Sequence, residues 1–192
     1  MSRLQKEFFF RESVVEISRD LLGKYLCTKI GDCITSAVIT ETEAYAGISD
    51  KASHAYNNRR TGRTETMFAE GGISYVYLCY GIHHLFNIVT NRKEIPHAVL
   101  IRAVQPVEGI ETILKRRKHK TMHSKIATGP GTVSQALGIK TSHNGIDLTG
   151  DSIWLEDRGM KINEIISGPR IGVDYAGEDA LLPYRFRVSD KK

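Results

Sequence analysis

The stretch Ser36-Ala37-Val38-Ile39-Thr40-Glu41-Thr42-Glu43-Ala44-Tyr45 decides the fold, because its β-branched residues predict a strand that ends in two acids and an aromatic ring. Alternate side chains of a strand lie on the same face, so Glu41, Glu43 and Tyr45 are expected to point the same way. Residues 41–87 then bring together carboxylates, tyrosines, a histidine, an amide and arginines. We expect the rest of the chain to pack around this segment.

A second aromatic strand is predicted at residues 73–80, just before a glycine. Residues 85–89 return beside it, so the pattern indicates a hairpin with Tyr80 exposed at its tip. Tyr75, Tyr77 and the following cysteine share one face under strict alternation. The period alone therefore does not select one of these side chains for a pocket.

Between these strands, residues 47–70 are polar and show no sustained period, which predicts a long loop containing His54. Long loops in compact domains are usually functional or disordered. Arg59, Arg60 and Arg63 suit a loop that faces phosphate, and a solvated surface loop is the alternative. Acids for chemistry, rings for a flat apolar group and cations for phosphate indicate an enzyme that acts on a base in nucleic acid.

The composition fits one domain spanning residues 1–192. Its 41% hydrophobic and 26% charged residues are ordinary for a globular chain and argue against general disorder. The 27 Lys and Arg residues exceed the 22 Asp and Glu residues, and the pI is ≈ 9.1. This mild basic excess is compatible with a polyanionic partner but does not establish one.

Targeting signals and metal-binding cysteine patterns are not visible in the sequence. The apolar residues 8–10 are too short for a signal peptide or a membrane span, so a cytoplasmic protein is expected. The three cysteines have no metal-like spacing. Cys27 and Cys33 can face each other across a short turn, although reduced, partly buried thiols are the expectation.

Turn and capping signals divide the rest of the chain into short elements. Ser13 followed by Glu16 forms a capping-box pattern before an apolar stripe, which predicts a helix that Gly23 can close. Two strands are predicted at residues 25–30 and 33–40. Further predicted elements are a strand at 98–104 ended by Pro106, a helix at 107–118, a helix at 130–137 bracketed by Pro130 and Gly138, and strands at 152–156, 170–174 and 185–188.

Other groups outside the central segment are candidates for contacts with anions. Arg102 lies inside an apolar strand and therefore needs an anion or strong acceptors. At the start of the helix at 130–137, the free amides of Gly131 and Thr132 can hold a phosphate. The basic run at 115–120 suits a helix C-terminus, and both a solvated helix end and a DNA contact remain open.

Two acids on one strand face fit a glycosidase-like pair, a metal site, or one catalytic residue beside a structural one. Carboxylates two positions apart project to the same side and repel, unlike the opposed pair that flanks a sugar bond. A metal site needs more ligands, and His83 and His84 on a strand point to opposite faces. We therefore expect one of Glu41 and Glu43 to do chemistry and the other to be held by a cation or by backbone amides.

These residues, in this order, resemble the core motifs of the alkyladenine (3-methyladenine) DNA glycosylase family in its bacterial form. The matching segments are Glu-Thr-Glu-Ala-Tyr at 41–45, His54, Met67-Phe68, Tyr-Val-Tyr-x-x-Tyr-Gly at 75–81, Asn87, Arg102, Gly129-Pro130, Gln135-Ala136-Leu137 and Pro169-Arg170-Ile171-Gly172-Val173. The resemblance extends from the first helix to Arg187. It implies an α/β (α+β) fold, a single domain with a curved, mostly antiparallel β-sheet flanked by helices.

The resemblance also implies a role for each candidate residue. Glu43 is the catalytic acid, and Arg102 lies near it and its water. The base-binding residues are Tyr45, His54, Tyr77, Asn87 and Ile171. Tyr80 matches the residue that wedges into the gap left by the flipped nucleotide. The candidate DNA-binding set also includes residues chosen from the sequence pattern itself, namely Arg59, Arg60, Arg63, Gly131 and Thr132. The backbone carbonyl of Ile171 helps to hold the water, although its side chain also fits a plain core position.

The implied activity is that of a monofunctional DNA glycosylase in base excision repair. It removes alkylated or deaminated purines, such as 3-methyladenine and hypoxanthine, from duplex DNA by base flipping and general-base activation of water. The matched pocket has no lysine for a Schiff base, and neither metal nor organic cofactor is implied. We expect a monomer whose partner is double-stranded DNA with damaged purines. The rival interpretations are a non-catalytic damage-recognition protein and a hydrolase of free nucleosides.

Overall fold

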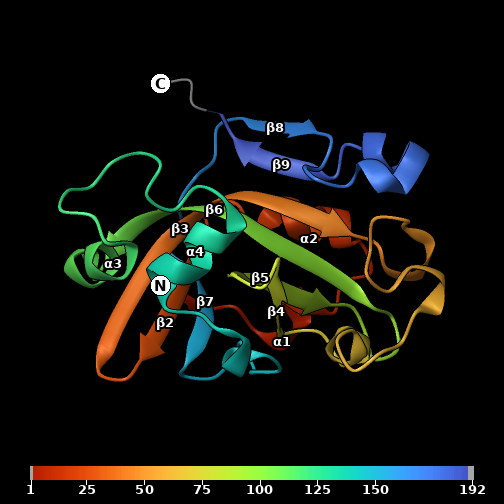
Figure 1. Cartoon of the computed structure of the whole chain (residues 1–192), viewed down its shortest axis with the longest axis horizontal. Coiled ribbons are helices and arrows are strands. Elements are labelled where there is room, and N and C mark those ends of the chain that lie inside the picture. Colours follow the sequence, from red (N-terminus) through yellow and green to blue (C-terminus); the bar gives the residue numbers. More distant parts are fainter. Residues whose placement is uncertain (1, 190–192) are drawn as a thin grey trace.

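One nine-stranded antiparallel sheet organises the chain, in a computed structural model that describes residues 2–189 (Figure 1). The strand order is β1-β7-β2-β3-β6-β5-β4, and β9 pairs with both β3 and β8. The strands are β1 (Ser2–Arg3), β2 (Tyr25–Ile30), β3 (Cys33–Tyr45), β4 (Ser74–Cys79), β5 (His83–Thr90), β6 (His97–Glu108), β7 (Ile153–Asp157), β8 (Ile165–Gly168) and β9 (Arg185–Val188). The predicted α+β class with an antiparallel sheet is confirmed.

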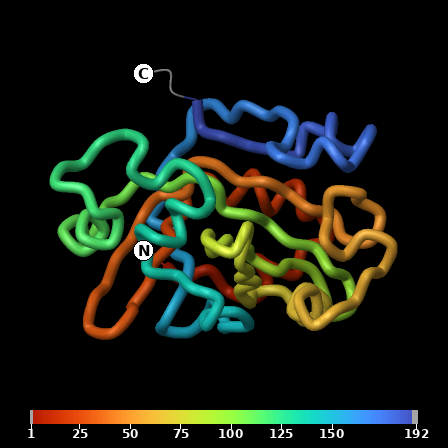
Figure 2. Tube along the Cα trace, viewed as in Figure 1, coloured from red at the N-terminus to blue at the C-terminus, as the bar shows by residue number. Residues whose placement is uncertain are grey.

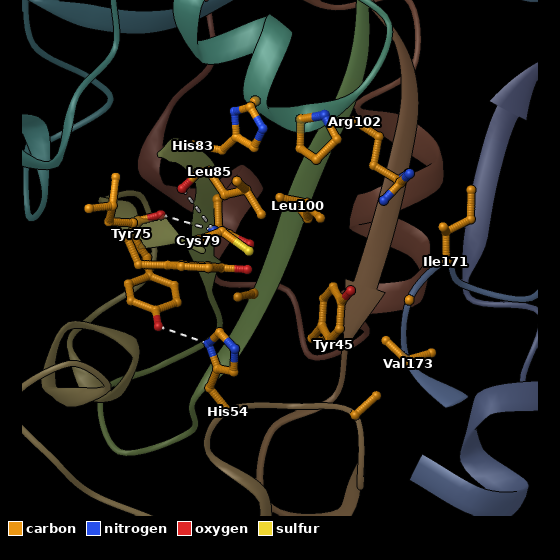
Figure 3. Close-up of a pocket in the computed structure, with 18 of the residues that line it drawn as sticks. Tyr45, His54, Tyr75, Cys79, His83, Leu85, Leu100, Arg102, Ile171 and Val173 are labelled. Atoms are coloured by element: carbon orange, nitrogen blue, oxygen red, sulfur yellow. Dashed lines mark hydrogen bonds between the residues drawn. The ribbon is translucent and has the colours of Figure 1, made fainter. Parts of the chain in front are cut away.

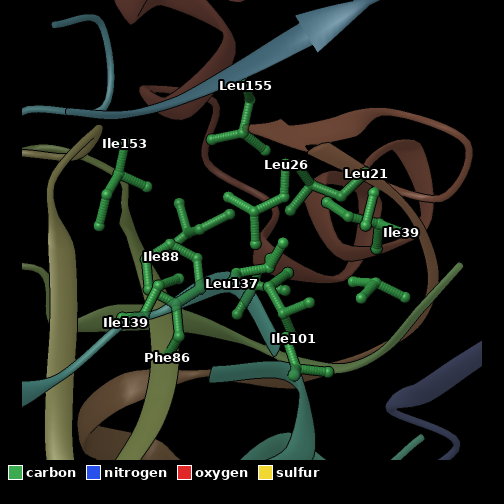
Figure 4. Packing of buried hydrophobic residues seen from close by; sticks show 14 of the residues in the cluster. Leu21, Leu26, Ile39, Phe86, Ile88, Ile101, Leu137, Ile139, Ile153 and Leu155 are labelled. Carbon is green, nitrogen blue, oxygen red and sulfur yellow. The ribbon is translucent and has the colours of Figure 1, made fainter. Parts of the chain in front are cut away.

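Helices pack against the sheet and fill the turns between its strands. The α-helices are α1 (Lys6–Phe9), α2 (Val14–Asp20), α3 (Ile110–Arg117) and α4 (Pro130–Leu137). The 3₁₀ helices are η1 (Gly47–Ser49), η2 (Tyr56–Asn58), η3 (Glu65–Phe68), η4 (Thr141–His143) and η5 (Asp174–Leu181). Side chains from α2, α4 and the central strands meet in one hydrophobic core (Figure 4). None of the described helices is long and apolar enough to cross a membrane.

Local signals placed α2 and α4 correctly. The Ser13 hydroxyl accepts a hydrogen bond from the backbone N–H of Glu16 at 3.2 Å, which caps α2 as predicted. Pro130 begins α4, where its fixed φ suits the first turn. Gly138 ends α4 in the left-handed conformation with φ 75°, which glycine adopts without steric cost.

Strand β3 is held along both edges, which makes it the rigid support of the site. Residues 36–45 of β3 pair with β6. On its other edge, β2 pairs with the first half of β3 and β9 pairs with residues 41–43. The β8–β9 hairpin, blue in Figure 1, therefore covers the part of β3 that carries the two acids.

Paired irregularities in β3 and β6 turn the acids away from the core. The register between these strands leaves Thr40 and Arg102 without partners. Before this point Ile39 belongs to the hydrophobic core, and after it Thr42 faces the core and donates a hydrogen bond to Ser18 O in α2 at 2.8 Å. The unpaired residue shifts the in–out alternation of the β3 side chains by one position. Glu41 and Glu43 therefore point to the face opposite the core, together with Arg102.

Two predicted elements were wrong. The helix predicted at residues 107–118 begins only at Ile110, because β6 continues through Pro106 to Glu108. Pro106 lies next to a register shift between β3 and β6, a position where a strand tolerates proline. The strand predicted at residues 170–174 is absent among the described residues, since the chain there forms bends that lead into η5.

Two other expectations about local structure are also resolved. Cys27 pairs with Ser36 rather than with Cys33, and both thiols are free. Cys27 is buried, and burial raises the pKa of its thiol to about 12. The predicted long loop at residues 47–70, orange to yellow in Figure 2, is ordered by η1, η2 and η3 and lies beside the end of β3.

Candidate active site

A cavity of ≈ 660 Å³ opens where β3, β4, β5 and β6 meet the loop at residues 47–70 (Figure 3). Its lining is mostly aromatic and apolar, with a few polar groups, as is usual for a small-molecule or base pocket. The start of α4 and residues 171–173 complete the wall. All five predicted base-binding residues line the cavity: Tyr45, His54, Tyr77, Asn87 and Ile171.

Three rings pack together along one wall of the cavity. The Tyr75 and Tyr77 ring centroids are 5.3 Å apart, and the His54 ring meets Tyr77 edge-on at 4.8 Å. A hydrogen bond joins His54 Nδ1 to the Tyr75 hydroxyl at 3.0 Å. Tyr45 lies across the cavity from them (Figure 3). These opposed ring surfaces suit a planar heterocycle.

The His54 imidazole is neutral near pH 7. Burial, together with the positive charges of Arg63 and Arg59, lowers its pKa to about 4. A neutral imidazole carries one N–H donor and one acceptor nitrogen. His54 can therefore hydrogen-bond a ligand while its Nδ1 is engaged by Tyr75.

Glu43 is a fully buried carboxylate directly behind the cavity wall, where it contacts three residues that line the cavity. Its Oε1 accepts a hydrogen bond from Ile171 N–H at 2.8 Å, and its Oε2 accepts one from the Tyr45 hydroxyl at 2.9 Å. Arg102 Nη1 lies 3.4 Å from Oε1. Burial raises the pKa of Glu43, while Arg102 and the two hydrogen bonds oppose the rise. Such a carboxylate is suited to accept a proton at neutral pH.

The second acid, Glu41, is held by cations, as the sequence predicted for one of the two. Its Oε1 accepts a hydrogen bond from Arg102 Nε at 3.2 Å and forms an ion pair with Arg185 Nε at 2.8 Å. Arg102 therefore bridges Glu41 and Glu43. The anion that an arginine in an apolar strand requires is this pair of carboxylates.

The three arginines of the loop have different surroundings. Arg60 forms ion pairs with Glu65 at 2.7 Å and Glu94 at 2.6 Å, so its charge is already compensated. Arg63 lies over the Tyr77 ring, with Cζ 4.4 Å from the centroid, and lines the cavity. Arg59 and Arg63 also line a neighbouring cavity of ≈ 400 Å³.

The start of α4 offers fewer free amides than predicted. The N–H of Thr132 donates to Gly129 O at 3.0 Å, so the expectation of a free amide there was wrong. Gly131 is packed so closely that a Cβ would lie 2.9 Å from the His83 ring, which also lines the cavity. Only glycine fits this position without a shift of His83.

Asn87 and Ile171 occupy distinct positions. Asn87 is buried, and its Nδ2 donates to Tyr75 O at 3.1 Å, which ties the cavity floor to β4. Ile171 is 49% exposed at the rim, so the expectation of a plain core position was wrong. Its backbone N–H is directed at the catalytic candidate Glu43.

Tyr80 is the most protruding aromatic residue of the site. It is 92% exposed in the turn between β4 and β5, with φ 51°, and it lines the cavity mouth. The hairpin-tip prediction from residues 73–89 placed it there. An exposed ring on a tight turn is a suitable shape for insertion between bases.

Sequence reasoning assigned no role to three residues around the site, namely Asp50, Arg170 and Tyr175. Arg170 and Asp50 form a buried ion pair at 2.5 Å, although no pattern links positions so far apart in the chain. Tyr175 is 70% exposed, donates to Ala52 O at 3.0 Å and lines both cavities. An isolated aromatic residue in a polar turn was the available signal for Tyr175. Within residues 2–189, no group of three or more His, Cys, Asp or Glu side chains is arranged to hold a metal ion.

Comparison with known proteins gives one consistent family. A family model described as methylpurine-DNA glycosylase matches residues 8–192. A protein of Chlamydia felis is 44% identical over 190 residues, which are 98% of this chain and 97% of that protein. A protein of Desulfitobacterium hafniense is 41% identical over 199 residues, covering 100% and 98% of the two chains. Both carry the name "Putative 3-methyladenine DNA glycosylase".

Proposed function

Because the chain belongs to the methylpurine-DNA glycosylase family, whose members are hydrolases, we propose that it removes alkylated or deaminated purines, 3-methyladenine and hypoxanthine among them, from duplex DNA. The observation that carries this proposal is the position of Glu43, a buried carboxylate hydrogen-bonded to a residue of an aromatic cavity. The product is an abasic site, which initiates base excision repair.

The cavity accepts a nucleotide that has left the base stack. A target bond inside a duplex is inaccessible, so the nucleotide must rotate outward at a cost of a few kcal/mol. Stacking on aromatic rings returns roughly 1–3 kcal/mol per base. Tyr45 on one side, and Tyr77 with His54 on the other, supply these surfaces. The hydrogen-bonding capacity of neutral His54 then contributes to recognition.

Glu43 acts as the general base in the proposed reaction. The oxygen of a water molecule bonds to C1′ as the bond from C1′ to the purine nitrogen breaks, and the electron pair leaves with the base. The carboxylate of Glu43 orients the water and takes its proton, an effect typically worth ~10²–10⁴-fold in rate. We assign the backbone carbonyl of Ile171, a residue that lines the cavity, to orienting the same water. The positive charge of Arg102 favours the ionised carboxylate, because it opposes the rise in the pKa of Glu43 that burial causes.

Strand cleavage as a second activity is not part of the proposal. A Schiff base at C1′ requires an amine nucleophile. No lysine is found among the described residues that line the cavity. The enzyme is therefore proposed to be monofunctional. We also propose that it acts as a monomer on its DNA.

Contacts with DNA are assigned to groups around the cavity mouth. Arg59 and Arg63 carry charges that are available for phosphates, whereas Arg60 is engaged by its two ion pairs. Gly131 at the start of α4 lies at the rim, where the helix terminus favours an anion, whereas the amide of Thr132 is engaged by Gly129 O. Salt sensitivity of binding is expected from these contacts.

Excision from duplexes that carry a single lesion tests the proposal. We expect duplexes with hypoxanthine or an alkylated adenine to yield an abasic site that breaks only after alkali treatment, while an undamaged duplex stays intact. Binding without excision would favour the damage-recognition alternative. Release of bases from free nucleosides at similar efficiency would favour the nucleoside-hydrolase alternative, and strand breaks without alkali would refute monofunctional chemistry.

Tyr80→Ser is expected to weaken binding to a lesion duplex by roughly 5- to 150-fold, because stacking on a base is worth ~1–3 kcal/mol. The side chain is 92% exposed, so the fold is unaffected. Fluorescence of a 2-aminopurine beside the lesion measures flipping, and Tyr80→Phe is the matched control that keeps the ring. Unchanged affinity and flipping in Tyr80→Ser would refute the proposed insertion.

Asn87→Ala is expected to raise excision of guanine relative to hypoxanthine by about tenfold, because the amide on the cavity floor crowds the 2-amino group that only guanine carries. The ratio of the two single-turnover rates is the measurement. Since Asn87 Nδ2 also holds Tyr75 O, the melting temperature is recorded alongside. A lower melting temperature with an unchanged ratio would assign Asn87 a structural role alone.

A further inference from the structure

The wall of the cavity at residues 169–173 is placed without help from the sheet. Ladder pairing of β8 stops at Gly168, and η5 begins at Asp174. Within this gap, Ile171 N–H bonds the Glu43 carboxylate at 2.8 Å. A segment without ladder hydrogen bonds needs another anchor to hold such an amide in place.

The anchor is the side chain of Arg170, which is 0% exposed. Its Nη1 and Nη2 donate to the two carboxylate oxygens of Asp50 at 2.5 and 2.8 Å. The same nitrogens donate to Ala44 O at 2.9 Å and to Asp179 O at 3.1 Å. This fork fixes residues 169–173 to the end of β3 and to η5, a geometry that a planar guanidinium provides and an ammonium does not.

Asp50 extends the anchor into the loop that follows β3. Its Oδ2 accepts from Ala46 N–H at 2.9 Å, and its Oδ1 accepts from Ala52 N–H at 3.0 Å. Both carboxylate oxygens are therefore bonded to Arg170 and to the loop backbone. The ion pair joins two sides of the cavity that lie 120 positions apart in the chain.

Arg170 also supports the base-stacking ring. Its Cζ lies 4.9 Å from the Tyr45 ring centroid and 5.4 Å from that of Tyr184. The Tyr45 hydroxyl in turn bonds Glu43. Among the described residues that line the cavity, neither Arg170 nor Asp50 appears, so the pair acts from behind the wall.

We propose that Arg170, paired with Asp50, is a positioning residue of the glycosylase site, which holds the Ile171 amide against Glu43 and the Tyr45 ring against the cavity without contacting the base. The inference rests on the proposed function for its catalytic consequence. Its structural consequence, the environment of the Glu43 carboxylate, can be measured without any substrate.

Two variants separate positioning from stability. Arg170→Lys keeps the charge beside Asp50 but cannot make all four hydrogen bonds of the guanidinium. The double variant Asp50→Asn/Arg170→Gln removes both charges together, so no unpaired charge is left buried. Melting temperatures identify which variants are folded at the assay temperature.

The direct readout is the titration of Glu43 in protein labelled with ¹³C at glutamate carboxyl groups, with the signal assigned by its loss in Glu43→Gln. The charged and titratable groups that face this carboxylate are Glu41, Tyr45, Arg102 and Arg170, with Arg185 behind Glu41. Loss of the Ile171 hydrogen bond removes one group that lowers the pKa of Glu43. We therefore expect the pKa to rise in both variants.

Excision and binding complete the test. We expect both variants to excise about tenfold more slowly than wild type at neutral pH. The acid limb of the pH profile should shift to higher pH. The affinity for a lesion duplex should stay within about threefold of the wild-type value. Folded variants that titrate and excise like wild type would overturn the proposal. A fall in lesion affinity with an unchanged excision rate would also overturn it, because the pair would then act on base stacking and not on the position of Glu43. Failure of the wild-type enzyme to excise would refute the proposed function alone, since the titration needs no activity.

Discussion

Glu43→Gln is expected to lower the single-turnover excision rate by orders of magnitude while lesion binding survives. A glutamine cannot take the proton of the attacking water, and each tenfold loss corresponds to about 1.4 kcal/mol of barrier. The stacking surfaces of Tyr45, Tyr77 and His54 are unchanged. Binding can even tighten slightly, because the substitution removes a negative charge that repels the DNA backbone.

The hydrogen bonds of Glu43 define what glutamine preserves. The amide oxygen can still accept from Ile171 N–H. The amide nitrogen then faces the Tyr45 hydroxyl, which must rotate to accept instead of donating. Because a hydroxyl can reverse its role, the variant is expected to fold normally. Single-turnover excision and equilibrium binding are measured on the same lesion duplex.

Glu41→Gln is the matched control. Glu41 forms ion pairs with Arg102 and Arg185, so its replacement is expected to reduce thermal stability more than the rate of chemistry. If Glu43→Gln excised at a near-wild-type rate, or if folded Glu41→Gln lost more catalysis, the general base would have been assigned to the wrong carboxylate.

Arg102→Met is expected to produce the second large loss, and this loss should depend on pH. Burial raises the pKa of Glu43, and Arg102 opposes the rise. Without the cation the pKa rises further, so less of the carboxylate is ionised at neutral pH. A neighbouring cation lowers a carboxyl pKa by roughly 1–3 units, so excision near pH 7 should fall by a factor of up to ~10³.

The sign of the pH dependence distinguishes this explanation from a direct contact with DNA. A general base works only when it is ionised, so the rate is lost as pH falls through the pKa of Glu43. In Arg102→Met that loss begins at higher pH, and alkaline buffer should restore part of the rate. Arg102→Lys is the control that keeps the charge. An equal loss at every pH would show that Arg102 acts on the substrate rather than on Glu43.

The sequence by itself determined the elements that local chemistry specifies. A capping serine defined the start of α2, and Pro130 with Gly138 defined both ends of α4. Alternation predicted that Glu41 and Glu43 share a face, and the hairpin signal exposed Tyr80. These features depend on neighbours within a few residues, which is why they can be predicted from a single chain.

The tertiary structure decided how those elements become a site. Strict alternation from Ile39 would have placed both acids on the core face. The register shift at Thr40 and Arg102, which only the pairing of β3 with β6 reveals, turned them away from the core and onto the face of Arg102. Arg60 fits a phosphate contact in the sequence, but its pairing with Glu94, 34 positions away, compensates its charge.

The remaining unpredicted features are long-range ion pairs. Arg102 meets Glu41 across 61 positions, and Arg170 meets Asp50 across 120. No local period or turn signal encodes such distances, because an ion pair is specified only when packing brings both charges into the same buried space. The position of Arg102 between both acids, and the second ion pair of Glu41 with Arg185, follow from packing rather than from the Glu-Thr-Glu spacing.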